Sequence, residues 1–181
     1  MQVTGNDQLG WLETLTATVA RILGMILVML MSAIVLDVTW QVFTRFILRD
    51  PSSFTEELAG FLLIWIGLLG ASYALYTRAH LGIDILTARL EGVKKRAAEI
   101  IIAVVVLLFA LFVLVIGGLR LVNLTFTLHQ ISPAMGIPMG YVYLVLPVTG
   151  ILMIYFAITF IVRAILKEQA VPEEHAVSGI E

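Results

Sequence analysis

The sequence contains no cysteine, so it offers neither a disulfide nor a thiolate metal site. Charge is also scarce, because Asp, Glu, Lys and Arg make up 13% of the 181 residues, against about a quarter in soluble domains. Hydrophobic residues make up 60%. These proportions exclude an ordinary soluble domain and indicate an integral membrane protein.

Catalytic and cofactor-binding patterns are absent as well. The three histidines, His80, His129 and His175, fall in predicted loops or in the tail, so no apolar segment offers an axial ligand for haem. The predicted spans hold no Ser and His pair, and the chain has no phosphate-binding glycine loop. We therefore predict no enzyme, no catalytic, cofactor or metal site, and no nucleic acid partner.

Four stretches with few charges have the length needed to cross a membrane, at about 22–42, 57–77, 99–120 and 141–163. A helix rises ~1.5 Å per residue, so about twenty residues match the ~30 Å hydrocarbon layer. The sequence therefore predicts an all-α integral membrane protein with one four-span domain over residues 1–181. The stretch from Glu168 to Glu181 is polar and contains a proline, and residues 164–181 are predicted to form a flexible cytoplasmic tail.

Basic residues gather on one side of these spans. The loop 78–96 carries five Lys or Arg beside an apolar stripe at helical spacing, which predicts an amphipathic helix at the membrane surface. A shorter amphipathic lead-in before the first span has a partly disordered tail as its alternative. Eight of the eleven basic residues fall on the side of the termini. The positive-inside rule then places both termini and the amphipathic helix in the cytoplasm.

Two residues are unusual inside the predicted spans. Asp37 would be costly in hydrocarbon, so it is expected to face protein or water. It is either a proton or cation site or a residue that reaches the interface or an intramolecular arginine. Trp65 falls near the middle of its span, where packing against protein is favoured over contact with lipid.

The start of the second span combines opposite charges. Ser53 followed by Glu56 matches a capping box, and Glu56 and Glu57 both complement the helix dipole. Alternatively, one of these glutamates pairs with Arg45 across the first helical hairpin. Further along, Gly67 and Ala71 belong to a series of small residues whose spacing suits close helix packing.

Other candidate positions lie in the loops and the last span. His80 and Asp84 are four residues apart, but no third ligand is near, so an interfacial hydrogen-bonding role is favoured over a metal site. Proline and polar residues separate the last two spans, and one proline falls inside the fourth span. These residues are Gln130, Ser132, Pro133, Pro138 and Pro147.

Several of these residues also carry a resemblance to a known family. The runs QVFTRF at 41–46, TEELA at 55–59, IWIG at 64–67, HLGID at 80–84 and QISPA at 130–134 occur in this order. Together they resemble the small membrane subunit of tripartite ATP-independent periplasmic (TRAP) transporters, the DctQ-like family. The sequence departs from the family at two positions. Phe54 stands where the family often has Trp, and Gly60 stands directly after the TEELA run, where the family often has a basic residue.

The resemblance implies a three-part uptake system in the bacterial inner membrane. A periplasmic binding protein captures an organic acid, and a large multi-span subunit carries it across by sodium symport. The small subunit supports the large one among the membrane lipids, and the sodium ions are expected to bind the large subunit. Two alternatives stay open: a stand-alone dimeric transporter that uses Asp37, and a membrane anchor of another complex.

Overall fold

The computed structural model describes residues 3–49, 52–77 and 92–169, and these form long helices with short connections. In chain order the elements are α1 (Val3–Phe43), η1 (Thr44–Leu48), α2 (Ser53–Tyr76), α4 (Gly92–Phe109), η2 (Ala110–Gly117), α5 (Gly118–Thr127), α6 (Met139–Tyr143) and α7 (Val145–Gln169). The described residues contain no β-strand, only an isolated bridge between Ile131 and Pro138. The predicted all-α class is confirmed for this part of the chain.

Among the described residues four apolar helical stretches are long enough to cross a membrane, as predicted. They are Gly10–Leu48, Ser53–Tyr76, Ala97–Thr127 and Met139–Val162, and each overlaps one predicted range. The third stretch is continuous through α4, η2 and α5. The predicted amphipathic helix between the second and third spans falls largely on residues 78–91, which lie outside the described residues.

The first helix differs from its prediction. The lead-in is not a separate surface helix, because α1 runs without interruption for 41 residues. The first proline of the chain is Pro51, so no residue before it removes a backbone donor from the helix. The helix ends only after η1, where Arg49 adopts a left-handed conformation with φ 57°. Its N–H bonds to the carbonyl of Thr44.

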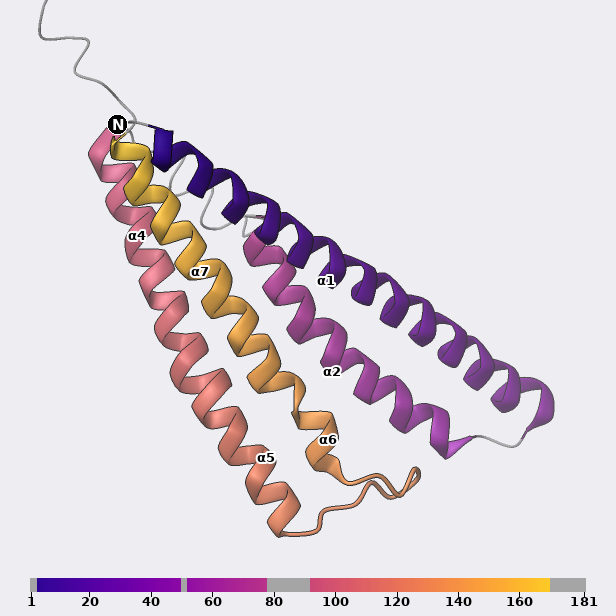
Figure 1. Cartoon of the computed structure of the whole chain (residues 1–181). Coiled ribbons are helices and arrows are strands. Elements are labelled where there is room, and N and C mark those ends of the chain that lie inside the picture. Colours follow the sequence, from indigo (N-terminus) through magenta and orange to yellow (C-terminus); the bar gives the residue numbers. More distant parts are fainter. Residues whose placement is uncertain (1–2, 50–51, 78–91, 170–181) are drawn as a thin grey trace, which may run out of the picture.

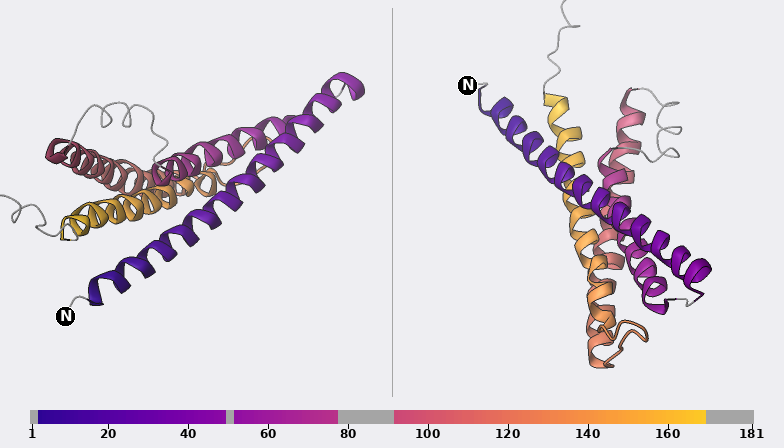
Figure 2. Two further views of the ribbon diagram at one scale, coloured as in Figure 1. Left: turned by 90° about the horizontal axis from the view of Figure 1, so that it is seen from above. Right: turned by 90° about the vertical axis from the view of Figure 1, so that its right-hand side faces the viewer.

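The helices pack in single file rather than as a square bundle. α1 packs on α2, α2 packs on α7, and α7 packs on α4 and η2, as Figure 1 shows. Viewed along this row in the right panel of Figure 2, α1 crosses in front of the other helices at an angle. In the most apolar stretch of the fourth span 44% of residues are buried, against 11% to 17% in the other three. α7 is therefore the central helix.

The row has two ends with different contents. The start of α1, the start of α4 and the end of α7 all lie at the same end of the molecule, which we call the terminal end (Figure 1). The connection from η1 to α2 and the connection from α5 to α6 lie at the other, which we call the loop end (Figure 1). The ends of the described chain thus share one side, as an even number of spans requires.

Buried apolar side chains run along the middle of this row. Phe156 on α7 is 1% exposed, and its ring centroid lies 5.4 Å from that of Tyr76 on α2. Beside it, the hydroxyl oxygens of Tyr155 and Thr16 lie 3.2 Å apart, which connects α7 to α1. The buried core residues are Ala20, Leu23, Leu69, Leu75, Ala110, Leu114, Val145, Met153 and Phe156. These contacts hold three of the helices together near the terminal end.

Candidate functional site

The carboxylate of Glu57 is held by the connection between α5 and α6. Its Oε2 accepts hydrogen bonds from the backbone N–H groups of Ala134, at 3.0 Å, and Met135, at 2.9 Å. The side chain of Ser132, which is 2% exposed, also hydrogen-bonds to Glu57. Successive backbone N–H groups of this kind form a concave anion site, and bonds to a charged acceptor are stronger than neutral ones. Glu57 thus links the beginning of α2 to a loop 77 residues away.

The loop that holds Glu57 has a defined shape of its own. The N–H of Ser132 donates to the carbonyl of Ile137, and that of Met139 donates to the carbonyl of Gln130, both at 2.9 Å. The N–H of Gly136 donates to the carbonyl of Ser132, also at 2.9 Å. Gly136 has φ 67°, a left-handed conformation that favours glycine. We call residues 132–136 the outer turn.

Two further hydrogen bonds from α2 reach the segment that follows the outer turn. The indole Nε1–H of Trp65 donates to the carbonyl of Val142 on α6 at 3.1 Å. The hydroxyl of Ser72 donates to the carbonyl of Thr149 on α7 at 3.4 Å. Spacings of eight and seven residues keep Glu57, Trp65 and Ser72 on one stripe of α2. We call these three residues the α2 seam, because they join α2 to the outer turn, α6 and α7 in succession.

Replacing Trp65 with phenylalanine tests the middle of the α2 seam. The ring is retained and the donor to Val142 is lost, so we expect a loss of about 0.5–1.5 kcal/mol in unfolding free energy, the usual net value of one hydrogen bond. Steric trapping in bicelles measures this difference. Trp40→Phe is the matched control, because Trp40 is 54% exposed. Equal losses from the two variants would contradict the role of the Trp65 bond.

The predicted charge pairing across the first hairpin is wrong. In the described part of the chain no ion pair joins Arg45 to Glu56 or Glu57; Arg45 and Glu56 are exposed, and Glu57 bonds to the outer turn instead. The predicted capping box is also wrong, because the N-cap is Ser52 and it makes no side-chain capping bond. The backbone N–H donors of the outer turn bind Glu57 in place of Arg45.

The series of small residues on α2 does not produce close packing within the chain. A Cβ added at Gly67 would meet nothing within 4 Å, and the same holds for Gly60 and Gly70. Gly67 is exposed and Ala71 is half-buried. The close approaches occur at Gly118, Gly140 and Gly150, where an added Cβ would lie 2.5–2.8 Å from the nearest atom. Within this chain the close approaches are at other glycines, and packing of Gly67 against a partner protein stays a prediction.

Asp37 lies on α1, the least buried span. Its Oδ2 is buried without a hydrogen-bond partner among the described residues, so the predicted pairing with an intramolecular arginine is not seen there.

The fourth span is interrupted at Leu144, three residues before Pro147, where α6 ends and α7 begins. A proline lacks the donor for the preceding turn, which explains this interruption.

His80 and Asp84 lie outside the described residues. Among the residues that the structure does describe, no three side chains of His, Asp, Glu or Cys form a group that could hold a metal ion. The structure also assigns a contact to Ser72, which the sequence analysis did not single out. Ser72 could have been found in the sequence, because it is a polar residue in an apolar helix and lies seven residues after Trp65, on the same stripe of that helix.

Comparison with known proteins identifies the family of this chain. The family model "Tripartite ATP-independent periplasmic transporters, DctQ component" matches residues 34–167, more than half of the chain. The sialic acid TRAP transporter small permease protein SiaQ of Vibrio cholerae is 28% identical over 144 residues, covering 80% of this chain and 82% of SiaQ. The C4-dicarboxylate TRAP transporter small permease protein DctQ of Rhodobacter capsulatus is 31% identical over 105 residues, covering 55% and 44%.

A longer relative matches over a small part of its own length. The isethionate TRAP transporter permease protein DctMQ of Oleidesulfovibrio alaskensis is 35% identical over 147 residues. The match covers 78% of this chain and 22% of DctMQ. The matched families and relatives are transporter permease components and not enzymes. The chain belongs to the DctQ component family of tripartite ATP-independent periplasmic transporters.

Proposed function

We propose that this chain is the small permease subunit of a TRAP-type secondary transporter. It holds a large multi-span subunit while that subunit takes up an organic acid with sodium ions, and a periplasmic binding protein delivers the acid. The observation that carries this proposal is the family match over residues 34–167, which includes all of α2, α5, α6 and the outer turn. The names of the relatives support a partner subunit, since SiaQ and DctQ are described as small permease proteins.

The arrangement of the helices suits a supporting role. The α2 seam fastens α2 to three successive parts of the chain, and aromatic contacts fasten α7 to α2 near the terminal end. Polar bonds between helices resist separation in lipid, where apolar contact alone does not favour one neighbour over another. A frame of this kind can stay fixed while a partner moves. Gly67, which has open space beside it, offers a close approach to the large subunit.

Charge and the positions of the described chain ends together support an orientation in the membrane. Both described chain ends lie at the terminal end, where most of the basic residues fall in the sequence. The positive-inside rule favours the cytoplasm for this end and the bacterial inner membrane for the protein. The loop end, with Glu57 and the outer turn, then faces the periplasm, where a binding protein would arrive.

Purification from the native membrane tests the proposal. We expect the tagged chain to copurify with one large multi-span membrane protein in a one-to-one complex, identified by intact mass in mild detergent. In proteoliposomes, uptake is expected to need this complex, the binding protein and a sodium gradient. A homodimer without a partner would contradict the proposal.

The orphan Oδ2 of Asp37 is the one observation that favours a stand-alone transporter. That alternative requires uptake by vesicles that contain only this chain, and its loss in the Asp37→Asn variant. The same proteoliposome assay separates the two functions, because the small subunit alone is expected to transport nothing.

A further inference from the structure

The outer turn depends on a side chain from a different helix for its position. Chain connectivity joins the turn to α5 and α6, whereas Glu57 joins it to α2. Among the described residues, the N–H of Ala134 donates only to Oε2 of Glu57. The N–H of Met135 donates to the same oxygen and, at 3.2 Å, to the hydroxyl of Ser132. The turn therefore cannot shift along α2 without breaking two bonds to a charged acceptor.

The outer turn and its flanks expose apolar surface at the loop end. Pro133 and Ala134 are exposed, and the neighbouring side chains of Leu128 and Ile131 are 57% and 60% exposed. These residues lie beyond the last residue of the third span, Thr127, and before the first residue of the fourth, Met139. These side chains are therefore expected to lie outside the hydrocarbon layer, where lipid tails do not contact them. A soluble protein surface with an apolar patch fits this position.

The loop end carries charged side chains of both signs. Arg45, Arg49 and Arg120 are exposed at or near this end, and the carboxylate of Glu57 is hydrogen-bonded to the outer turn. Glu56 is the remaining exposed carboxylate in the described first turn of α2. Charged groups of both signs on a partner would complement these residues and steer association.

We propose that Glu57 is a positioning residue that holds the outer turn in the shape to which the periplasmic binding protein docks. This inference rests on the proposed function and adds a residue and a contact to it. A turn that is ordered before docking does not lose conformational freedom on docking. If the turn loses this order, binding of the partner becomes weaker, whereas the transport step is unaffected. Glu57 acts through the turn and not by direct contact with the partner, because its Oε2 already accepts hydrogen bonds from Ala134 and Met135.

The test is uptake by the reconstituted complex as loaded binding protein is titrated. For Glu57→Ala we expect the half-saturating concentration of binding protein to rise about threefold to tenfold, the range of one lost ordering contact. The maximal rate and the yield of the complex are expected to stay within about twofold of the wild type. Glu57→Gln is expected to raise the half-saturating concentration less than Glu57→Ala, because the amide carbonyl can still accept both N–H bonds but is a neutral and weaker acceptor.

Glu56→Ala is the matched control, since it removes the same charge from the adjacent exposed position. We expect it to leave the half-saturating concentration unchanged. Hydrogen exchange gives the second readout: the amides of Ala134 and Met135 are expected to exchange faster in Glu57→Ala and not in Glu56→Ala. If Glu57→Ala fails to assemble, Gly136→Ala strains the turn from within and is expected to raise the half-saturating concentration in the same way.

Three results would overturn the inference. One is unchanged amide exchange in Glu57→Ala, and another is faster exchange without a change in the half-saturating concentration. The third is an equal effect of Glu56→Ala, which would assign the result to charge alone. Failure of the proposed function has a different signature, because the wild-type complex would then transport without a binding protein or would have no large subunit.

Discussion

Replacing Gly150 with leucine is expected to separate α7 from η2 and destabilise the chain more than any substitution at an exposed position. A Cβ added at Gly150 would lie 2.7 Å from Cγ2 of Val115, 2.9 Å from Cβ of Leu114 and 3.1 Å from the backbone N of Val115. A helix backbone cannot yield as the end of a flexible side chain does. We expect a loss of about 3 kcal/mol or more in unfolding free energy, at or beyond the upper end for overpacking.

Gly67→Leu is the matched control for this experiment. It adds the same side chain to a glycine in a membrane helix, but nothing lies within 4 Å of the added Cβ. We expect the isolated chain with this substitution to unfold with a free energy within about 0.5 kcal/mol of the wild type, as at exposed positions elsewhere. Steric trapping in bicelles measures both variants. A similar loss for both would mean that the distances at Gly150 do not govern stability.

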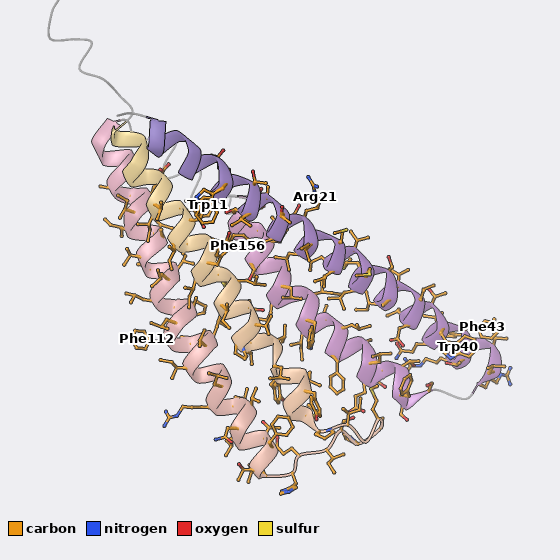
Figure 3. All side chains as sticks on the ribbon, viewed as in Figure 1. Trp11, Arg21, Trp40, Phe43, Phe112 and Phe156 are labelled. Carbon is orange, nitrogen blue, oxygen red and sulfur yellow. The ribbon has the colours of Figure 1, made fainter. Side chains whose placement is uncertain are left out.

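The second large effect is expected from Phe156→Ala. Phe156, labelled in Figure 3, is 1% exposed on the central helix, and the centroid of its ring lies 5.4 Å from that of Tyr76 and 5.6 Å from that of Tyr155. Truncation leaves a cavity that α7 cannot close without losing its contacts to α2. We expect the unfolding free energy to fall by about 3–5 kcal/mol, the range for buried aromatic side chains.

Phe112→Ala provides the comparison, since Phe112 is 60% exposed on η2 and points away from the row (Figure 3). In lipid this side chain exchanges one apolar neighbour for another, so the same truncation is expected to cost less than about 1 kcal/mol. Chemical denaturation in mixed micelles, followed by circular dichroism, ranks the two variants. If Phe112→Ala were the more damaging, η2 rather than the contact between α7 and α2 would be the centre of the fold.

The four spans could be predicted because uncharged length is a direct physical requirement of the bilayer. The packing partners could not, since an apolar helix in lipid has no solvent-facing side that marks the opposite face as buried. Gly67 and Gly150 show the difference: both lie in apolar helices, and only the structure reveals that Gly150 meets η2. The uninterrupted length of α1 was missed for a related reason, because a change in polarity near Arg21 does not by itself end a helix.

Glu57 illustrates what residue spacing can and cannot reveal. The sequence analysis selected it and offered two partners, the helix start and Arg45, both near in the chain. Its observed partners are backbone N–H groups at Ala134 and Met135. Every residue except proline has such a group, so the amino-acid types carry no mark of the pair. Only the turn that aims two donors at one point distinguishes these residues, and that shape depends on contacts far apart in the sequence.

The single-file packing of the helices affects how the protein behaves once it leaves the membrane. Four helices of ~10 Å diameter in a row have a longer perimeter than the same four in a square. A detergent belt must wrap both broad faces of the row, so the free chain of 19.9 kDa is expected to carry more detergent for its mass than a square bundle would. A partner protein that covers one broad face would displace the detergent from that face, and only the opposite face would remain in contact with lipid.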